Sequence, residues 1–457
     1  MNERIEAVTP PFCFAVVGDT HFADIPAQRE FAWKAPGTRP LDAGKYVENV
    51  DYALTPMMES LRSAEPAFVL LTGDLAEGQG ANVRPEELAA AVRFFSSHDL
   101  PLLFARGNHD PSPAYETHVL PRIERVLGME VDRSYYSFEI GGCRFVVLDS
   151  TTWGDGDVQR GWFEGILSDS VASDLRLFVF AHHPVWPVSR AFFSNLQFSS
   201  DLARLLSIYA VDAYFCGHTH NQSMMLKTTS GYPVLQCMGA PIGLPEELPT
   251  PLNRVQARLV GEDEVLWSWS GYLENTAPGW FIVQVQEDRV EVRWHHLNRG
   301  VESVVSFRQS GMPHQIWELT HPEDARLIYR DIPHLRRAYL RFCAWDAMRP
   351  GKQVRLNGEF VGDLPHGAQF APRRMDLPEA ALARLDLVNR IEIDAPGVEA
   401  STIGNLQIEA VLPGGRVVRT RPTGDIYTWS DRWDAWRVPR MRKIMLGRPI
   451  RTTLSFR

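Results

Sequence analysis

Short runs of consecutive apolar residues alternate with longer amphipathic stretches through roughly the first 300 residues. The apolar runs cover residues 12–17, 68–72, 102–105, 145–148, 175–181 and 212–216. Uninterrupted runs of this length are typical of strands that are buried on both faces of a sheet. Between them, residues 46–62 and 195–209 carry apolar positions at helical spacing, and Pro85-Glu86-Glu87 begins a further helix. Strands that alternate with helices predict an α/β domain.

The pattern becomes rich in short strands beyond residue 300. Before this change, a hairpin is predicted at residues 135–140 and 143–148, around two glycines. The last two strands of the first domain are predicted at residues 280–285 and 290–295. Further strands are predicted at residues 354–361, which contain an Asn357-Gly358 turn, and at 390–393, 406–412 and 416–420. We therefore predict a first domain over residues 1–300, a linker over 301–325 and a β-sandwich over 326–457. The turn and its return strand resemble those of a galactose-binding-like jelly roll.

The composition excludes several classes of protein. The chain has 457 residues, 44% of them apolar and 23% charged, and a net charge of -9. This acidic balance argues against a nucleic-acid partner and against a polybasic membrane binder. The apolar runs are too short to cross a bilayer, and the first residues lack the apolar segment of a signal peptide. Five cysteines without a CxxC pair indicate free thiols in a reducing compartment, so we expect a cytoplasmic protein.

Five polar motifs each follow a predicted strand. They are Gly18-Asp19-Thr20-His21, Gly73-Asp74, Gly107-Asn108-His109-Asp110, Ala181-His182-His183-Pro184 and Gly217-His218-Thr219-His220. Carboxylate, imidazole and amide groups suit Zn, Mn or Fe, and loops at strand ends can converge on one site. Taken singly, each motif also fits an ordinary turn or a packed histidine. Their joint occurrence, in order and at strand ends, favours a metal centre.

This set of motifs resembles the calcineurin-like metallophosphoesterase superfamily over residues of about 12 to 295. Within it, the His182-His183-Pro184 segment resembles a bacterial branch that hydrolyses cyclic nucleotides and glycerophosphodiesters. The resemblance implies a four-layer αββα sandwich in the first domain, which would be catalytic, and an accessory role for the β-sandwich.

The resemblance also implies a role for each motif residue. Asp19, His21, Asp74 and His220 would bind one metal ion, and Asp74, Asn108, His182 and His218 the second, so that Asp74 bridges. His109 would contact the phosphate or the leaving group and would be held by Asp110. His183 would lie behind the ligands or simply pack. Arg106 stands where the family pattern has no basic residue; it would contact substrate phosphate or, as the favoured interpretation, form a surface ion pair.

The resulting hypothesis is a phosphoesterase that depends on two divalent or trivalent ions (Fe, Mn or Zn). A metal-bridging hydroxide would attack a phosphodiester in line. A phosphatase acting on monoesters and a nuclease would use the same site, although the first domain shows no basic track for a nucleic acid. A binding scaffold without turnover is the alternative from another class. We expect a small phosphate ester as substrate and no membrane partner, and the Pro-rich residues 241–278 are a candidate interface for a homo-oligomer.

Overall fold

The structure, a computed structural model, describes most of the chain. The described residues are 5, 8–23, 50–77, 83–154, 158–173, 175–186, 195–218, 222–227, 234–239, 273–274, 279–297, 300–310, 314–320, 327, 329–345, 350–365, 373–394, 401–413, 417–420, 423, 426–429 and 441–456. They form two compact units, the first ending at Thr320 and the second lying in the chain beyond it. Each unit is built around its own hydrophobic core.

The first sheet of the first unit has seven strands in the order β14-β13-β12-β11-β1-β2-β3. Their bounds are β1 (Phe12–Val17), β2 (Val69–Leu71), β3 (Leu102–Phe104), β11 (Gly279–Val285), β12 (Arg289–His296), β13 (Gly300–Ser310) and β14 (His314–Thr320). Strands β1, β2 and β3 are parallel, whereas β11 to β14 form an antiparallel meander beside β1. The three parallel strands therefore end at the same edge.

The second sheet also has seven strands, in the order β10-β8-β9-β7-β6-β5-β4. Their bounds are β4 (Tyr136–Ile140), β5 (Cys143–Val147), β6 (Arg176–Phe180), β7 (Ala213–Cys216), β8 (Gln222–Lys227), β9 (Val234–Met238) and β10 (Leu273–Glu274). Strands β5, β6, β7 and β9 are parallel, and β4 and β5 form the predicted hairpin. The parallel strands of the second sheet thus lie at its centre, whereas those of the first sheet lie at one end.

Aromatic side chains join the two sheets face to face. The ring of Phe14 in β1 meets Phe145 in β5 edge-on at 5.2 Å and Phe178 in β6 at the same centroid distance. All three side chains are fully buried. Edge-on aromatic pairs add to the large apolar area that each ring removes from water. This packing fixes the two sheets relative to each other.

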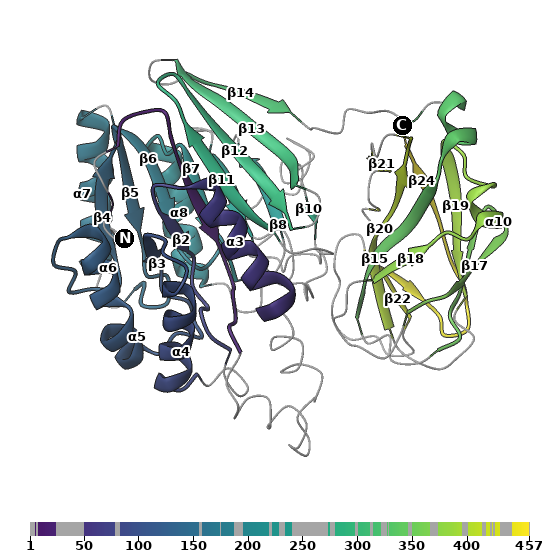
Figure 1. The fold of residues 1–457 in the computed structure, drawn as a ribbon, viewed down its shortest axis with the longest axis horizontal. Coiled ribbons are helices and arrows are strands. Elements are labelled where there is room, and N and C mark those ends of the chain that lie inside the picture. Colours follow the sequence, from purple (N-terminus) through teal and green to yellow (C-terminus); the bar gives the residue numbers. More distant parts are fainter. Residues whose placement is uncertain are drawn as a thin grey trace. The chain divides into compact units, whose positions relative to one another are not determined.

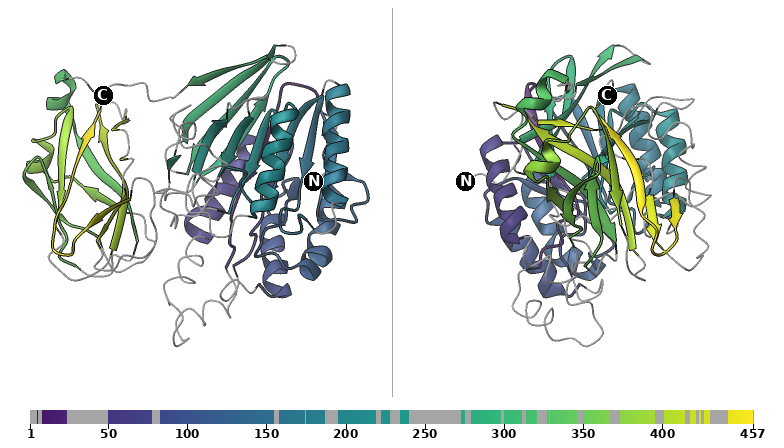
Figure 2. Two further views of the ribbon diagram at one scale, coloured as in Figure 1. Left: turned by 180° about the vertical axis from the view of Figure 1, so that it is seen from behind. Right: turned by 90° about the vertical axis from the view of Figure 1, so that its right-hand side faces the viewer.

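Helices cover the outer faces of the packed sheets. They are α3 (Thr55–Ala64), α4 (Pro85–Ser96), α5 (Ser112–His118), α6 (Leu120–Leu127), α7 (Val158–Ala172) and α8 (Leu196–Ile208), and a π-helical turn at Val50–Leu54 precedes α3. In the right-hand view of Figure 2, the purple α3 and the teal α7 and α8 lie on opposite sides of the sheets. Helix α4 begins at Pro85 as predicted, and Asn195 caps α8 by accepting a hydrogen bond from the Phe198 amide.

The predicted boundary at residue 300 is wrong, and so is the linker over residues 301–320. This segment forms β13 and β14, which extend the first sheet, with Phe307 opposite Val290 of β12. Val305 and Phe307 are buried in the core of the first unit. The segment alternates apolar and polar residues because one face of the sheet is buried there, and this alternation resembles the β-rich sequence that follows it.

The second unit contains two β-sheets around one core (Figure 1). One sheet has the order β18-β15-β20-β22-β23 with β21 on β20, and the other has the order β17-β16-β19-β24. Their strands are β15 (Arg337–Trp345), β16 (Gln353–Leu356), β17 (Glu359–Asp363), β18 (Arg373–Asp376), β19 (Val388–Ile393), β20 (Ser401–Val411), β21 (Val417–Arg419), β22 (Ile426–Trp429), β23 (Met441–Ile444) and β24 (Ile450–Ser455). A 3-10 helix (Tyr329–His334) and the short α10 (Glu379–Leu382) accompany them.

The Asn-Gly turn of this unit is present as predicted. Asn357 and Gly358 connect β16 to β17, with φ values of 50° and 88°. Two positive φ angles are what a two-residue hairpin turn of the I′ type requires. The β-rich character of the second unit is therefore confirmed, and its jelly-roll connectivity stays a prediction.

Two expectations from composition can be compared with the described residues. Among these residues, Cys13, Cys143, Cys216 and Cys237 are free thiols, as expected. Among the helices that the structure describes, none combines the length and the apolar character needed to cross a membrane.

The corrected boundary predicts that Phe307→Ala destabilises the first unit. Phe307 is 1% exposed, so its truncation leaves a cavity and should cost about 3–5 kcal/mol of unfolding free energy. Phe360→Ala, at a side chain that is 44% exposed in the second unit, is the control and should cost far less. Denaturant unfolding measures the free energy of unfolding of both variants. Equally small losses would contradict the corrected boundary and support a linker over residues 301–320.

Candidate metal centre

The predicted motif residues lie where parallel strands of both sheets end. Asp19 and His21 follow β1, Asp74 follows β2, and Asn108 follows β3 in the first sheet, while His182 follows β6 and His218 follows β7 in the second. The backbone amide of His218 donates to both carboxylate oxygens of Asp19, at 2.7 and 2.8 Å. Loops that are up to 199 residues apart in the chain therefore meet at one place, as the strand-end argument predicted.

Four of these residues have backbone angles in the left-handed region. Their φ values are 49° at Asp19, 40° at His21, 51° at Asp74 and 75° at His218. Side chains other than glycine rarely adopt these angles, and such strain persists only where surrounding contacts enforce it. Its concentration at the motif residues is typical of a functional site.

Glycines beside the motif residues are required by crowding. A Cβ atom on Gly107 would lie 2.2 Å from the Oδ1 atom of Asp74, and one on Gly217 would lie 2.3 Å from the Oδ2 atom of Asp19. No side chain fits within these distances without moving the carboxylates. These glycines therefore make room for acidic side chains from other loops.

The imidazole of His182 lies close to several oxygen and nitrogen atoms that can accept a hydrogen bond or bind a cation. Its Nδ1 donates to the Thr72 carbonyl at 2.9 Å, which leaves Nε2 facing the site. Nε2 lies 3.2 Å from Asp74 Oδ2 and 2.9 Å from Asn108 Oδ1. It also lies 3.2 Å from His218 Nδ1. Several lone pairs directed at one point need a cation between them, either a proton or a metal ion.

Asp74 belongs to two clusters of ligand atoms, a first cluster with Asp19 and His21 and a second cluster with His182 and His218. The side chains of Asp19, His21 and Asp74 each offer one atom within 4.8 Å of the others, and so do Asp74, His182 and His218. His21 Nδ1 donates to Glu77 Oε2 at 2.6 Å, and His21 Nε2 lies 3.7 Å from Asp74 Oδ2. A histidine held by a carboxylate on one nitrogen and open on the other is a common metal-binding arrangement. The described residues thus fit two cations around one shared carboxylate.

The electrostatics of these buried groups also call for positive charge. Burial raises the pKa of Asp19 to about 7. Burial alone would lower the pKa of His182, but the adjacent carboxylate of Asp74 raises it to about 9. Burial also opposes ionisation of Asp74, yet the charges of His182 and His109 hold its pKa well below the usual value. Acidic groups this deeply buried are stabilised by cations placed among them.

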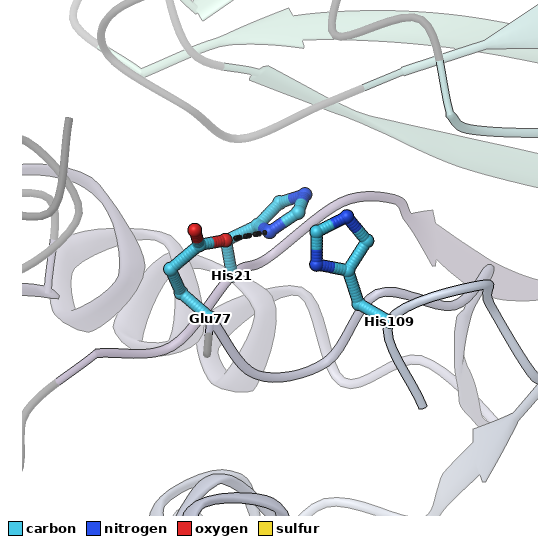
Figure 3. A group of neighbouring side chains, drawn as sticks. All are labelled: His21, Glu77 and His109. Atoms are coloured by element: carbon cyan, nitrogen blue, oxygen red, sulfur yellow. Dashed lines mark hydrogen bonds and ion pairs between the residues drawn. The ribbon is translucent and has the colours of Figure 1, made fainter. Parts of the chain in front are cut away.

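His109 lies beside the first cluster, and its predicted partner is wrong. Figure 3 shows the ring of His109 turned toward His21 and Glu77. Its buried Nδ1 atom has no hydrogen-bond partner, and its Nε2 lies 4.0 Å from Asp74 Oδ2. Asp110 does not hold this ring, because its carboxylate accepts hydrogen bonds from the backbone amides of Gly107, Asp74 and Leu75. Asp110 instead fixes the loops that carry Asp74 and His109.

The three remaining predicted residues have different outcomes. His183 is buried and pairs with the Ser150 hydroxyl at 2.8 Å, and its burial holds the pKa well below the usual value. Arg106 forms an ion pair with Asp149 at 3.2 Å, but Asp149 is fully buried, so this is not the surface ion pair that was the favoured prediction. His220 lies outside the described residues.

Comparison with known proteins matches part of the sequence to a family. Residues 13–222, which lie within the first unit, match the sequence model of the calcineurin-like phosphoesterases. This segment is similar to the calcineurin-like phosphoesterases. The calcineurin-like phosphoesterases with which it shares sequence are hydrolases of phosphoric ester bonds, so the protein is a hydrolase of this kind.

Similar proteins include both diesterases and phosphatases by name. A protein described as a probable cyclic nucleotide phosphodiesterase of Rhodococcus erythropolis is 28% identical over 225 residues, which are 46% of this chain and 71% of that protein. The mouse serine/threonine-protein phosphatase CPPED1 is 26% identical over 232 residues, 47% of this chain and 70% of that protein. The purple acid phosphatase PPD1 of yellow lupin is 14% identical with a TM-score of 0.45, and the match covers 65% of this chain but only 54% of the plant enzyme.

Glu77 is the residue of this calcineurin-like phosphoesterase site that the sequence argument missed. It lies three residues after Asp74, on the loop that leaves β2, and holds His21 through the bond described above. The motif pattern stops at Gly73-Asp74, and an acid in the following loop looks like a solvated surface residue. Only its position opposite His21 distinguishes it.

The geometry separates the two adjacent histidines. His182→Ala should remove a metal ion, because His182 Nε2 faces Asp74 and Asn108, whereas His183→Ala should retain it because His183 is bonded to Ser150. Metal content after loading with Mn²⁺ and desalting measures the difference. Equal losses in the two variants would contradict the assignment.

Glu77→Gln should weaken metal binding through His21. An amide cannot provide the charge of the carboxylate that holds His21 Nδ1, and changes of this kind typically cost about 10–100-fold in metal affinity. Calorimetric titration with Mn²⁺ measures the effect. Glu59→Gln, at an exposed position of α3, is the matched control and should bind as the unaltered protein does.

Proposed function

We propose that the protein hydrolyses a small phosphodiester by in-line attack of water at a site that holds two metal ions. The observation that carries this proposal is the position of Asp74. Its carboxylate belongs to both clusters of ligand atoms, one with Asp19 and His21 and the other with His182 and His218. Two cation positions that share one carboxylate suit two-metal phosphoester hydrolysis, in which a pair of neighbouring ions stabilises the attacking and leaving oxygens.

The ligand sets follow from the clusters together with the family pattern. Asp19, His21 and Asp74 would hold the first ion, with His220 completing the set by its place in the motif. Asp74, Asn108, His182 and His218 would hold the second. When bound, the two ions supply an activated water and positive charge at the phosphoryl oxygens. The donors are compatible with Fe, Mn or Zn.

His109 is the group best placed to act on substrate. Its side chain is partly exposed, at 18%, while Asp19, His21 and Asp74 are almost fully buried. Its backbone amide donates to Asp74 Oδ1 at 2.8 Å, so the ring is held next to the shared carboxylate. A protonated ring there can donate to a phosphoryl oxygen or to the departing alkoxide, a contribution of about 10²–10⁴-fold.

Sequence similarity favours a diester over a monoester as the proposed substrate class. The Rhodococcus relative carries a phosphodiesterase name, and the His182-His183-Pro184 segment resembles the diesterase branch. The mouse relative carries a phosphatase name, which makes the monoester the competing substrate class.

A substrate panel on metal-loaded protein tests the proposal. Cyclic nucleotides, glycerophosphodiesters and phosphomonoesters are compared after chelation and Mn²⁺ addition. We expect turnover of at least one diester to exceed that of its matched monoester by about tenfold or more, with the chelated protein as the inactive control. Faster turnover of monoesters would indicate a phosphatase instead of a diesterase. A lack of metal-dependent turnover of every ester would refute the proposal.

A further inference from the structure

Arg106 contacts both ends of the loop that carries Asn108 and His109. It lies between the end of β3 and Gly107, and its Nε donates to the carbonyl of Asp110 at 2.8 Å. The amide of Asp110 donates to the Gly107 carbonyl at 3.2 Å across the same loop. The guanidinium therefore closes this loop from outside the ligand clusters.

The same guanidinium reaches the second sheet. Arg106 Nη1 donates to Asp149 Oδ2 at 3.2 Å, and Asp149 follows β5 of that sheet. Asp149 is fully buried, and its Oδ2 also accepts from the Ser134 hydroxyl at 2.6 Å. Its Oδ1 accepts from the amide and the hydroxyl of Thr151. An ion pair so enclosed links the edges of two sheets that share no hydrogen-bonded strand.

The loop that contains Asp149 is also hydrogen-bonded to the loop of His182, a ligand of the second cluster. Ser150, the next residue, accepts a hydrogen bond from the amide of His183 at 3.1 Å, and its hydroxyl pairs with the His183 ring. His183 adjoins His182 in sequence. A continuous path thus runs from the Asn108 loop through Arg106, Asp149 and Ser150 to the loop of His182.

We propose that Arg106 and Asp149 are positioning residues that set the separation between Asn108 and His182 and thereby the affinity of the second metal position. This inference rests on the two-metal function proposed above. Asn108 follows β3 of the first sheet and His182 follows β6 of the second. Because Asn108 Oδ1 lies only 2.9 Å from His182 Nε2, the edges of the two sheets must be held close together there. The described members of the first cluster, Asp19, His21 and Asp74, all come from one sheet, so their separations do not depend on this link.

Two observations favour positioning over the other roles open to an arginine here. The side chain of Arg106 is 14% exposed and two of its nitrogen atoms are already bonded, so a substrate phosphate would have to compete with Asp149. A buried ion pair is also a weak source of stability, because desolvation of both charges offsets their attraction. A fixed geometry between two ligand loops accounts for a pair in this place.

Mn²⁺ titration of four variants tests the inference, with the full chain stripped of metal before each experiment. The variants are Arg106→Gln, Arg106→Lys, Asp149→Asn and Asn108→Ala, and Arg204→Gln is the matched control because it removes an exposed ion pair with Glu164. Calorimetry gives the two affinities, and electron paramagnetic resonance separates spin-coupled pairs from isolated Mn²⁺. Thermal unfolding identifies any variant that fails to fold.

We expect Arg106→Gln and Asp149→Asn to weaken the second binding step by about 10–100-fold and to leave the first step unchanged. Their spectra should show isolated rather than coupled Mn²⁺, as Asn108→Ala should. Arg106→Lys should be intermediate, since it keeps the charge but cannot bond Asp149 and Asp110 with one planar group. Arg204→Gln should bind as the unaltered protein does.

Other outcomes overturn one claim or the other. Two unchanged binding steps in Arg106→Gln and Asp149→Asn, or equal losses at both steps, would refute the positioning role. An unaltered protein that binds fewer than two Mn²⁺ ions would refute the two-metal proposal and this inference with it. If Arg106→Gln does not fold, the comparison of Asp149→Asn with Arg106→Lys decides by the same criteria.

Discussion

The carboxylate of Asp74 is the constraint around which the first unit is organised. It is nearly inaccessible to solvent, its Oδ2 lies 3.2 Å from His182, and its Oδ1 accepts the backbone amide of His109. Burying an acid in this way is unfavourable unless charges and donors surround it. The neighbouring loops supply those partners, and Gly107 leaves the space that the carboxylate occupies.

The packing of the two sheets makes this arrangement possible. Phe14 meets Phe145 and Phe178 across the interface, so the ends of β1 to β3 face the ends of β6 and β7. Closely packed interiors transmit small displacements, because side chains have few voids into which to relax. The aromatic core therefore determines distances between ligands to which it makes no direct contact. The backbone is strained at the ligand positions, as the left-handed φ angles of Asp19, His21, Asp74 and His218 show.

The supporting contacts behind the ligands differ between the two clusters. Glu77 holds His21 within a single sheet, whereas Asn108 and His182 come from opposite sheets and are connected through Arg106 and Asp149. Such supporting groups are part of how a protein sets metal affinity. Helix α7 contributes to this framework, since Gln159 accepts the amide of Asp149 and donates to its carbonyl. The polar residues Gln159 and Ser170 are buried in that helix, which explains why its sequence lacks a clear apolar face and was not predicted.

The sequence by itself determined the positions of the central strands along the chain, the Asn357-Gly358 hairpin and the motifs that follow strands, because buried strands and tight turns leave local patterns in the sequence. It did not determine that residues 301–320 complete the first sheet, since an edge strand with one buried face reads the same in either unit. Nor did it determine that Asp110 binds backbone amides, that Glu77 holds His21, or that Arg106 pairs with Asp149. Those contacts join residues 35, 56 and 43 positions apart. The first two contacts join loops after neighbouring strands of one sheet, and the third joins the two sheets. The tertiary structure alone therefore decided which polar groups became partners.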